Sequence, residues 1–115
     1  MTPAERRALD RFVEAVRAHY GDGLDEIVVF GSRARGDETP DSDVDLAIIL
    51  RDTVSDYWSE KFLLVDLSGD ALLDAGLIIQ SFPISRAEWT SPDSHRNPRF
   101  VRAIRRDAKP IRELA

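Results

Sequence analysis

The chain has 115 residues, the length of a single domain with one hydrophobic core over residues 1–115. Hydrophobic residues make up 43% of it and charged residues 32%, which excludes a disordered segment. The absence of cysteine excludes disulfides, thiolate metal sites and cysteine nucleophiles. No apolar stretch approaches the roughly 20 residues of a membrane helix, and the N-terminus lacks an apolar signal region. We therefore expect a cytoplasmic protein with no membrane partner.

The net charge of −5 disfavours general binding to nucleic-acid polymers, whose phosphates require clustered Lys and Arg. The charge is unevenly distributed. Residues 96–112 hold seven basic residues against one acid, Asp107, which leaves a net −11 for the rest of the chain. Two interpretations of this basic tail stay open: a solvated helix face, or a surface that meets triphosphate charge, an RNA acceptor or an acidic partner.

The first half of the chain predicts one helix and two strands. A helix is expected over residues 3–20, because Thr2 and Glu5 have the spacing of a capping box and apolar residues follow at helical spacing. Two apolar, β-branched runs, residues 25–30 and 42–50, are typical of buried strands.

The middle of the chain predicts a connection and a long helix. The glycine-punctuated residues 31–41 leave room for one helical turn. Ser55 is expected to cap an amphipathic helix that Gly69 divides and Gly76 ends. Its large apolar residues are expected to face a core, with a base-stacking platform as the alternative for the aromatic pair. They are Trp58, Phe62, Val65, Leu72 and Leu73.

The last part of the chain predicts a third strand and a helix. Residues 77–84 form an apolar run in which Pro83 indicates an edge or a strand end. A helix over residues 98–106 is expected to be capped by Asn97. The predicted fold class is therefore α/β (α+β): a small mixed sheet of three or more strands flanked by helices.

Two carboxylates in the second strand indicate a metal site. Asp43 and Asp45 share one face of the strand, because successive side chains alternate, and a repeat of about 6.8 Å lets both reach one cation. Ligands that are all oxygen suit Mg²⁺ or Mn²⁺. Asp41 completes the start of a calcium loop, but Leu46 stands where that loop requires glycine, which excludes an EF-hand.

A turn upstream of these acids has the features of a phosphate site. Gly31 follows an apolar strand and permits close approach of the backbone to a ligand, while Ser32 offers a hydroxyl and the next amides. Arg33 and Arg35 add positive charge beside the turn, with an exposed surface role as the alternative. A phosphate cradle ahead of a metal-binding pair is the arrangement that holds a nucleoside triphosphate with its cation.

This motif resembles that of minimal nucleotidyltransferases (MNT) of the DNA polymerase β superfamily, of the MntA-like antitoxin type. It consists of Gly31-Ser32, ten intervening residues, and Asp43-x-Asp45 with Ser42 before and Leu46 after. The resemblance implies a nucleotidyltransferase fold in which Gly31 and Ser32 bind the triphosphate of ATP or another NTP. It further implies that Asp43 and Asp45 hold two Mg²⁺ ions, and that a nucleoside monophosphate passes to a hydroxyl with release of pyrophosphate.

The chain departs from the family in one respect. Active members commonly carry a third carboxylate on a neighbouring strand, but residues 77–84 contain no acid, and Gln80 or Ser81 would occupy the place. Two hypotheses remain open: a working transferase that obtains the acid elsewhere, and a nucleotide-binding or partner-binding module with weak or no turnover. The acids considered as replacements are Asp66, Asp70, Asp74 and Glu88.

The acceptor is expected to bring its own recognition, because a chain of this size has little surface for enclosing a second substrate. Domains similar to this one are often encoded beside small helical HEPN proteins, and in such pairs the transferase is an antitoxin that nucleotidylates its partner. The resemblance thus favours a hydroxyl of a HEPN-type protein as acceptor, over a small molecule such as an aminoglycoside.

Overall fold

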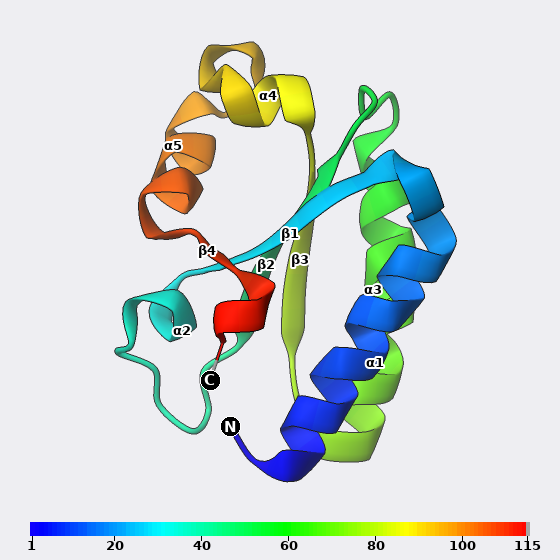
Figure 1. Cartoon of the computed structure of the whole chain (residues 1–115), viewed down its shortest axis with the longest axis vertical. Helices are drawn as coiled ribbons and strands as arrows, with labels where there is room; N and C mark the ends of the chain where they lie inside the picture. Colours follow the sequence, from blue (N-terminus) through cyan, green and yellow to red (C-terminus); the bar gives the residue numbers. More distant parts are fainter. Residues whose placement is uncertain (115) are drawn as a thin grey trace.

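The computed structural model describes residues 1–114 and contains a four-stranded mixed sheet with helices on both faces (Figure 1). The fold class predicted from the sequence is therefore confirmed. The helices and strands are α1 (Pro3–Tyr20), β1 (Leu24–Phe30), α2 (Ser32–Arg35), β2 (Val44–Leu50), α3 (Tyr57–Ala75), β3 (Ile79–Ser85), α4 (Arg86–Thr90), α5 (Pro98–Asp107) and β4 (Lys109–Pro110).

The strands lie in the order β3-β2-β1-β4. β1 pairs with β2 and with β4 in the antiparallel sense, whereas β3 is parallel to β2 after the α3 crossover. Helices α1 and α3 cover one face of the sheet, and α2, α4 and α5 lie on the other (Figure 1). β3 is an edge strand, which agrees with the position expected for Pro83.

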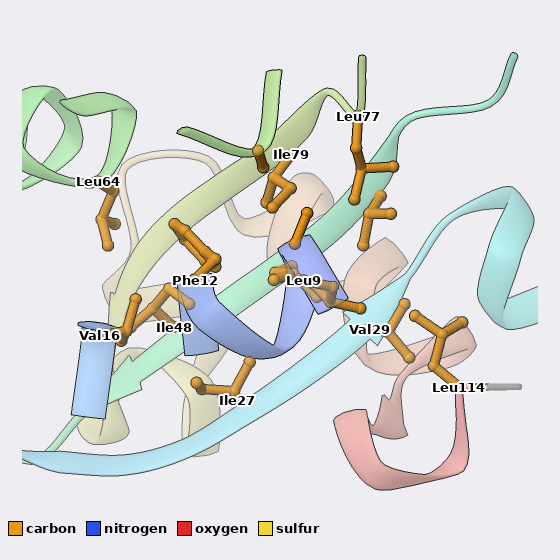
Figure 2. Close-up of a cluster of buried hydrophobic side chains, with 14 of the residues drawn as sticks. Leu9, Phe12, Val16, Ile27, Val29, Ile48, Leu64, Leu77, Ile79 and Leu114 are labelled. Carbon is orange, nitrogen blue, oxygen red and sulfur yellow. The ribbon is translucent and has the colours of Figure 1, made fainter. Parts of the chain in front are cut away.

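Each face of the sheet has its own hydrophobic core. The larger core lies under α1 and α3, where alternate residues of β2 meet both helices (Figure 2). Side chains drawn there include Leu9, Phe12, Val16, Ile27, Val29, Ile48, Leu64, Leu77, Ile79 and Leu114. The smaller core lies on the α5 side and consists of Val28, Ala47, Ile49, Ile84 and Ile104.

Helix termini follow the capping residues. The predicted capping box at α1 is confirmed, since the Thr2 hydroxyl accepts from the Glu5 amide and the Glu5 carboxylate accepts from the Thr2 amide. Asn97 caps α5, as expected. At α3 the prediction was wrong by one residue: Asp56, not Ser55, accepts from the Ser59 amide at 3.2 Å. An aspartate one position later starts the helix because its carboxylate reaches the free amides of the first turn.

The predicted break in α3 was also wrong, because the helix continues through Gly69. β2 and β3 each begin two residues later than predicted, at Val44 and Ile79. The short elements α4 and β4 were not predicted at all. Within residues 1–114, no helix combines the length and the apolar character needed to cross a membrane.

The apolar face expected for α3 is the largest error of the sequence interpretation. Its large apolar side chains are exposed, with Trp58 56% and Phe62 63% accessible, so they are neither core residues nor covered by another element. Leu64 and Ala71 pack against the sheet instead. α3 is apolar on two faces, and the sheet can cover only one of them. The exposed residues are Trp58, Phe62, Val65, Leu72 and Leu73.

Candidate functional site

The two carboxylates lie at the start of β2, on the face of the sheet that carries α2 and α5. Asp45 is half-buried and pairs in the sheet with Phe30 on one side and Gln80 on the other. Burial raises the pKa of the Asp45 carboxyl, and the negative charge of Asp43 raises it further, while Arg35 acts in the opposite direction. Two like charges are thus held together at a half-buried place, where a cation would relieve their repulsion.

Gly31 fits closely against Asp45. Its φ of 74° lies in the left-handed region that favours glycine, and it ends β1 directly before α2. A Cβ at this position would overlap Oδ2 of Asp45 and lie 3.2 Å from its Cγ. Because residue 31 has no side chain, the Asp45 carboxylate packs directly against its backbone. This contact explains why the motif has glycine at position 31.

Ser32 is the first residue of α2, a single helical turn that the Gly31 carbonyl caps with hydrogen bonds. This carbonyl accepts from the amides of Ala34 and Arg35, both at 3.1 Å. Ser32 directly follows Gly31, against which the Asp45 carboxylate packs. The β1–β2 pairing, in which Phe30 is opposite Asp45, brings Gly31 and Asp45 together.

Arg33 holds the loop rather than facing the site. Its guanidinium is buried and donates to the Ser42 carbonyl from Nε at 3.2 Å and from Nη2 at 2.8 Å. The Ser42 hydroxyl accepts from the Thr39 amide at 2.9 Å, which closes the end of the loop. Since Ser42 directly precedes Asp43, this clamp fixes the position of the first carboxylate. We therefore regard Arg33 and Ser42 as positioning residues.

Arg35 is exposed and pairs with two carboxylates. Its Nη1 lies 2.9 Å from Asp107 at the end of α5, and its Nε lies 3.2 Å from Asp37. These hydrogen bonds raise the pKa of Arg35, and its charge lowers the pKa of Asp45. Arg35 is thus an exposed cation close enough to Asp45 to affect its pKa. A phosphate bound at the site would compete with Asp107 for the Arg35 guanidinium.

Gln80 is the β3 residue that pairs with Asp45 in the sheet, and it is the position where the family resemblance led us to expect a third acid. Its side chain is exposed and, being an amide, supplies neither charge nor a proton acceptor. Glu88 is committed to capping α4, because its carboxylate accepts from the Ser85 amide at 3.0 Å and the Ser85 hydroxyl at 2.9 Å. The other acids considered, Asp66, Asp70 and Asp74, are exposed on α3, which covers the opposite face of the sheet (Figure 1). They are therefore not placed to act with Asp45.

The donor set fits a divalent cation. Asp43 and Asp45 offer carboxylate oxygens only, the type of ligand that Mg²⁺ and Mn²⁺ take in proteins. Among residues 1–114, no group of three or more His, Cys, Asp and Glu side chains is placed to hold an ion. A cation here would therefore need ligands from phosphate oxygens and water to complete its shell, as Mg²⁺ does when it binds with a nucleotide.

An aromatic cluster borders the carboxylates. The ring centroids of Phe82 and Phe100 are 5.1 Å apart, and Phe30 lies 6.0 Å and 6.2 Å from them. Phe82 and Phe100 also line a cavity of about 220 Å³. Other lining residues are Tyr57, Pro83, Ile84, His95, Arg96 and Asn97. The cluster joins α5 to the sheet, and the cavity lies along β3 beyond Gln80.

Comparison with known proteins identifies the family. Residues 9–105 match the nucleotidyltransferase domain family. The chain belongs to this family. A protein of Methanocaldococcus jannaschii named "Putative protein adenylyltransferase" is 36% identical over 77 residues, which is 67% of this chain and 70% of that protein. This nucleotidyltransferase family generally uses a nucleoside triphosphate and a divalent metal, and its members are enzymes.

Solved structures show the same fold. The structure titled "Crystal structure of a putative nucleotidyltransferase from Sulfolobus solfataricus at 1.40 A resolution" aligns with a TM-score of 0.56 at 21% identity, over 82% of this chain and 78% of that one. The structure titled "Structure of putative minimal nucleotidyltransferase" aligns with a TM-score of 0.51 at 26% identity, over 93% of this chain and 95% of that one. The fold predicted from the short motif is therefore confirmed over most of the chain.

Sequence reasoning missed three features of the site. The buried clamp of Arg33 looks like a charged loop residue in the sequence, and only its hydrogen bonds to Ser42 reveal it. The pairing of Arg35 with Asp107 joins segments 72 residues apart and carries no local signal. The packing of Phe30 on Phe82 follows from strand pairing, so an expected β1–β2–β3 order could have found it.

Proposed function

We propose that this nucleotidyltransferase uses ATP and Mg²⁺, or Mn²⁺, and transfers a nucleoside monophosphate to a hydroxyl of a partner protein. The observation that supports the proposal is the packing of Asp45 against Gly31, which brings one of the two proposed metal-binding carboxylates next to the glycine of the proposed phosphate turn. The similarity to a protein named as an adenylyltransferase of proteins supports a protein acceptor.

The chain's own residues supply binding and orientation in this reaction. Asp43 and Asp45 would hold the cation, the Ser32 hydroxyl and the amides of its turn would hold phosphate oxygens, and Arg35 would add positive charge. The cation, when bound, neutralises the phosphates and the charge that develops on the leaving oxygen. The acceptor oxygen forms a bond to the α-phosphorus while the bond to the β-phosphate oxygen breaks, and pyrophosphate leaves.

The hydroxyl proton lacks an obvious acceptor on this chain, because Gln80 cannot take it. We propose that water or a group on the acceptor protein takes it, so that turnover depends on the partner. We propose the cavity that Phe82 and Phe100 line, on this face of the sheet, as the place for an acceptor side chain. A small helical HEPN-type protein is the partner that we propose, in an antitoxin reaction. An aminoglycoside-type small molecule is the alternative acceptor.

The experiment combines purified protein, α-labelled ATP and Mg²⁺ with a purified small helical protein of the HEPN type. Label on that protein, absent with Asp43→Asn and present with Asp41→Asn, supports the proposal. Asp41 is a matched control because it is an exposed acid of the same loop, outside the carboxylate pair. Efficient labelling of an aminoglycoside without the protein acceptor would contradict the antitoxin role.

A second variant separates a working transferase from a binding module. Gln80→Glu places a carboxylate beside Asp45. If the missing acid limits turnover, the variant raises the transfer rate at least about tenfold, since general bases contribute about 10²–10⁴. Nucleotide binding without transfer in both forms would assign the chain to the alternative, a nucleotide-binding or partner-binding module.

A further inference from the structure

The exposed face of α3 carries an unusual amount of apolar surface. Of the seven large hydrophobic residues exposed within residues 1–114, six lie on α3 or just after it. We call them the α3 stripe: Trp58, Phe62, Val65, Leu72, Leu73 and Ile78. Apolar side chains exposed together in this way commonly mark interaction sites.

The spacing of the α3 stripe matches helix-on-helix packing. Residues 58, 62, 65, 69 and 72 follow alternate steps of four and three, the pattern of a seam that contacts another helix. α3 has 19 residues and is therefore about 28 Å long at 1.5 Å per residue. Gly69 lies within the seam, and a Cβ added there would meet no atom within 4 Å. A mid-helix glycine costs about 1 kcal/mol relative to alanine, and nothing in this chain requires it.

Charges beside the α3 stripe indicate which kind of helix fits. At 3.6 residues per turn, Asp66 and Asp70 lie along one side of the stripe, and Lys61 and Ser68 lie along the other. Asp66 and Asp70 are exposed, and within residues 1–114 neither makes an ion pair. The groove that they line with α1 also contains Arg11, which pairs instead with Asp74 at 3.5 Å. This acidic edge would complement basic residues on an incoming helix.

A second copy of the chain does not offer those basic residues. Two α3 helices packed antiparallel about a two-fold axis would place acidic edge beside acidic edge. Packed parallel, they would place the acidic edge beside Lys61 and Ser68. The Lys61 ammonium already donates to the Ser81 carbonyl at the free edge of β3, and the Ser68 hydroxyl donates to the Val65 carbonyl at 2.8 Å. Both groups are therefore committed within the chain.

We propose that the α3 stripe docks an amphipathic helix of a partner protein, with an apolar seam flanked by Lys or Arg on the side that meets Asp66 and Asp70. The stripe lies on the face of the sheet opposite to the carboxylate site, so a docked partner leaves Asp43 and Asp45 accessible. The inference does not depend on the transfer reaction, because binding is measured without nucleotide.

The test uses two fluorescein-labelled helical peptides of 21 residues that share one apolar seam and carry either Lys or Glu at the flanking positions. Anisotropy is measured while the full chain is added at low salt. We expect the Lys-flanked peptide to bind at least tenfold more tightly than the Glu-flanked one. Equal binding of the two peptides, or no binding of either, would overturn the proposal.

Variants localise the binding. Phe62→Ser with Leu72→Ser should weaken the Lys-flanked peptide at least tenfold, and both sites are exposed, so circular dichroism and Tm should stay unchanged. Asp66→Asn with Asp70→Asn should weaken it about threefold to tenfold. The control pair Glu14→Gln and Asp22→Asn, which removes the same charge from exposed positions outside α3, should not.

Two further results would contradict the proposal. If the control pair weakens the peptide as much as the α3 pair does, binding follows net charge and not the acidic edge. If sedimentation shows a dimer of the unmodified chain that Phe62→Ser with Leu72→Ser dissociates, a second copy occupies the α3 stripe.

Discussion

The two faces of β2 differ in what their side chains do. Toward α1 and α3, Val44, Leu46 and Ile48 are completely buried in the larger core. Toward α2 and α5, the same strand begins with Asp45 and then continues with the buried Ala47 and Ile49. Residues 45 and 46 are thus neighbours in sequence with opposite surroundings, one a half-buried charge and the other a core leucine.

The residues of β2 that stabilise the fold therefore lie on one face of the strand, and the carboxylate proposed to bind metal lies on the other. The larger core holds β2 rigidly, and the rigid strand presents the carboxylates to the turn at Gly31. On the other face, burial and the charge of Asp43 both disfavour the ionised form of Asp45. A carboxylate whose ionised form is disfavoured, next to a glycine turn at the end of a strand, is typical of a functional site. Substitutions on the two faces should therefore affect different properties.

The largest expected effect is that of Asp45→Asn on activity. Removing one of the two carboxylates should lower nucleotide transfer by about 10³-fold, a loss at the upper end of that for a single stabilising group in an active site. The Tm should stay equal or rise, because the pKa of Asp45 is raised in the folded protein and its charge therefore opposes folding at neutral pH. Labelled-ATP transfer and thermal melts measure both, with Asp41→Asn as control. A Tm that falls with activity would show that Asp45 is structural.

Leu46→Ala should show the reverse behaviour. Leu46 is completely buried, and removing its side chain should lower the free energy of unfolding by about 3–5 kcal/mol. Denaturant titration measures this change. The folded fraction should keep a transfer rate per folded molecule within about threefold of the unsubstituted protein, since the face that meets substrate is unchanged. A loss of transfer activity in fully folded Leu46→Ala would contradict the claim that the two faces of β2 affect different properties.

Arg33→Lys should affect both stability and substrate binding, because Arg33 of α2 donates hydrogen bonds to the carbonyl of Ser42, the residue before Asp43. Lysine cannot make the two hydrogen bonds to the Ser42 carbonyl, and their loss should cost about 1.5–3 kcal/mol of stability. We also expect weaker binding of the metal–nucleotide complex, measured by calorimetry at a temperature where the variant is folded. Unchanged affinity in a destabilised variant would limit Arg33 to a role in folding.

Glu5→Ala should have the smallest effect and only on stability. The Thr2 amide lowers the pKa of the Glu5 carboxyl below its ordinary value of 4.5. The carboxylate's contribution is therefore present above that ordinary value and is lost as pH falls through the lowered folded value. The variant should lose about 0.5–1 kcal/mol near neutral pH. The gap in Tm should close as the pH falls below 4.5 and through the lowered folded value. A gap that is independent of pH would show that the charge of Glu5 does not contribute to the capping box.

Local patterns were sufficient to predict much of the fold. The capping box at Thr2 and Glu5, the cap at Asn97 and the alternation in β2 are short-range signals, and each was confirmed. The turn at Gly31 was also predicted, since glycine after a strand has few other uses. The contact of Gly31 with Asp45 depends on the β1–β2 register, which no local pattern in the sequence predicts.

Features that depend on tertiary context were not predictable. An apolar residue of α3 looks the same in sequence whether the sheet covers it, as for Leu64, or leaves it exposed, as for Phe62. Arg33 and Arg35 are two residues apart in one turn, yet one is buried as a clamp and the other pairs with Asp107 across the surface. Only the packing of α2 against the loop and α5 distinguishes them.

A crystal of the full chain soaked with Mn²⁺ and α,β-methylene ATP would show where the cation and the triphosphate bind. We expect anomalous density in contact with Asp43 and Asp45, and the triphosphate against the Ser32 turn. The same soak of Asp45→Asn should lose the anomalous peak. A cation and nucleotide bound away from these three residues, or full retention of the peak in Asp45→Asn, would contradict the proposed site.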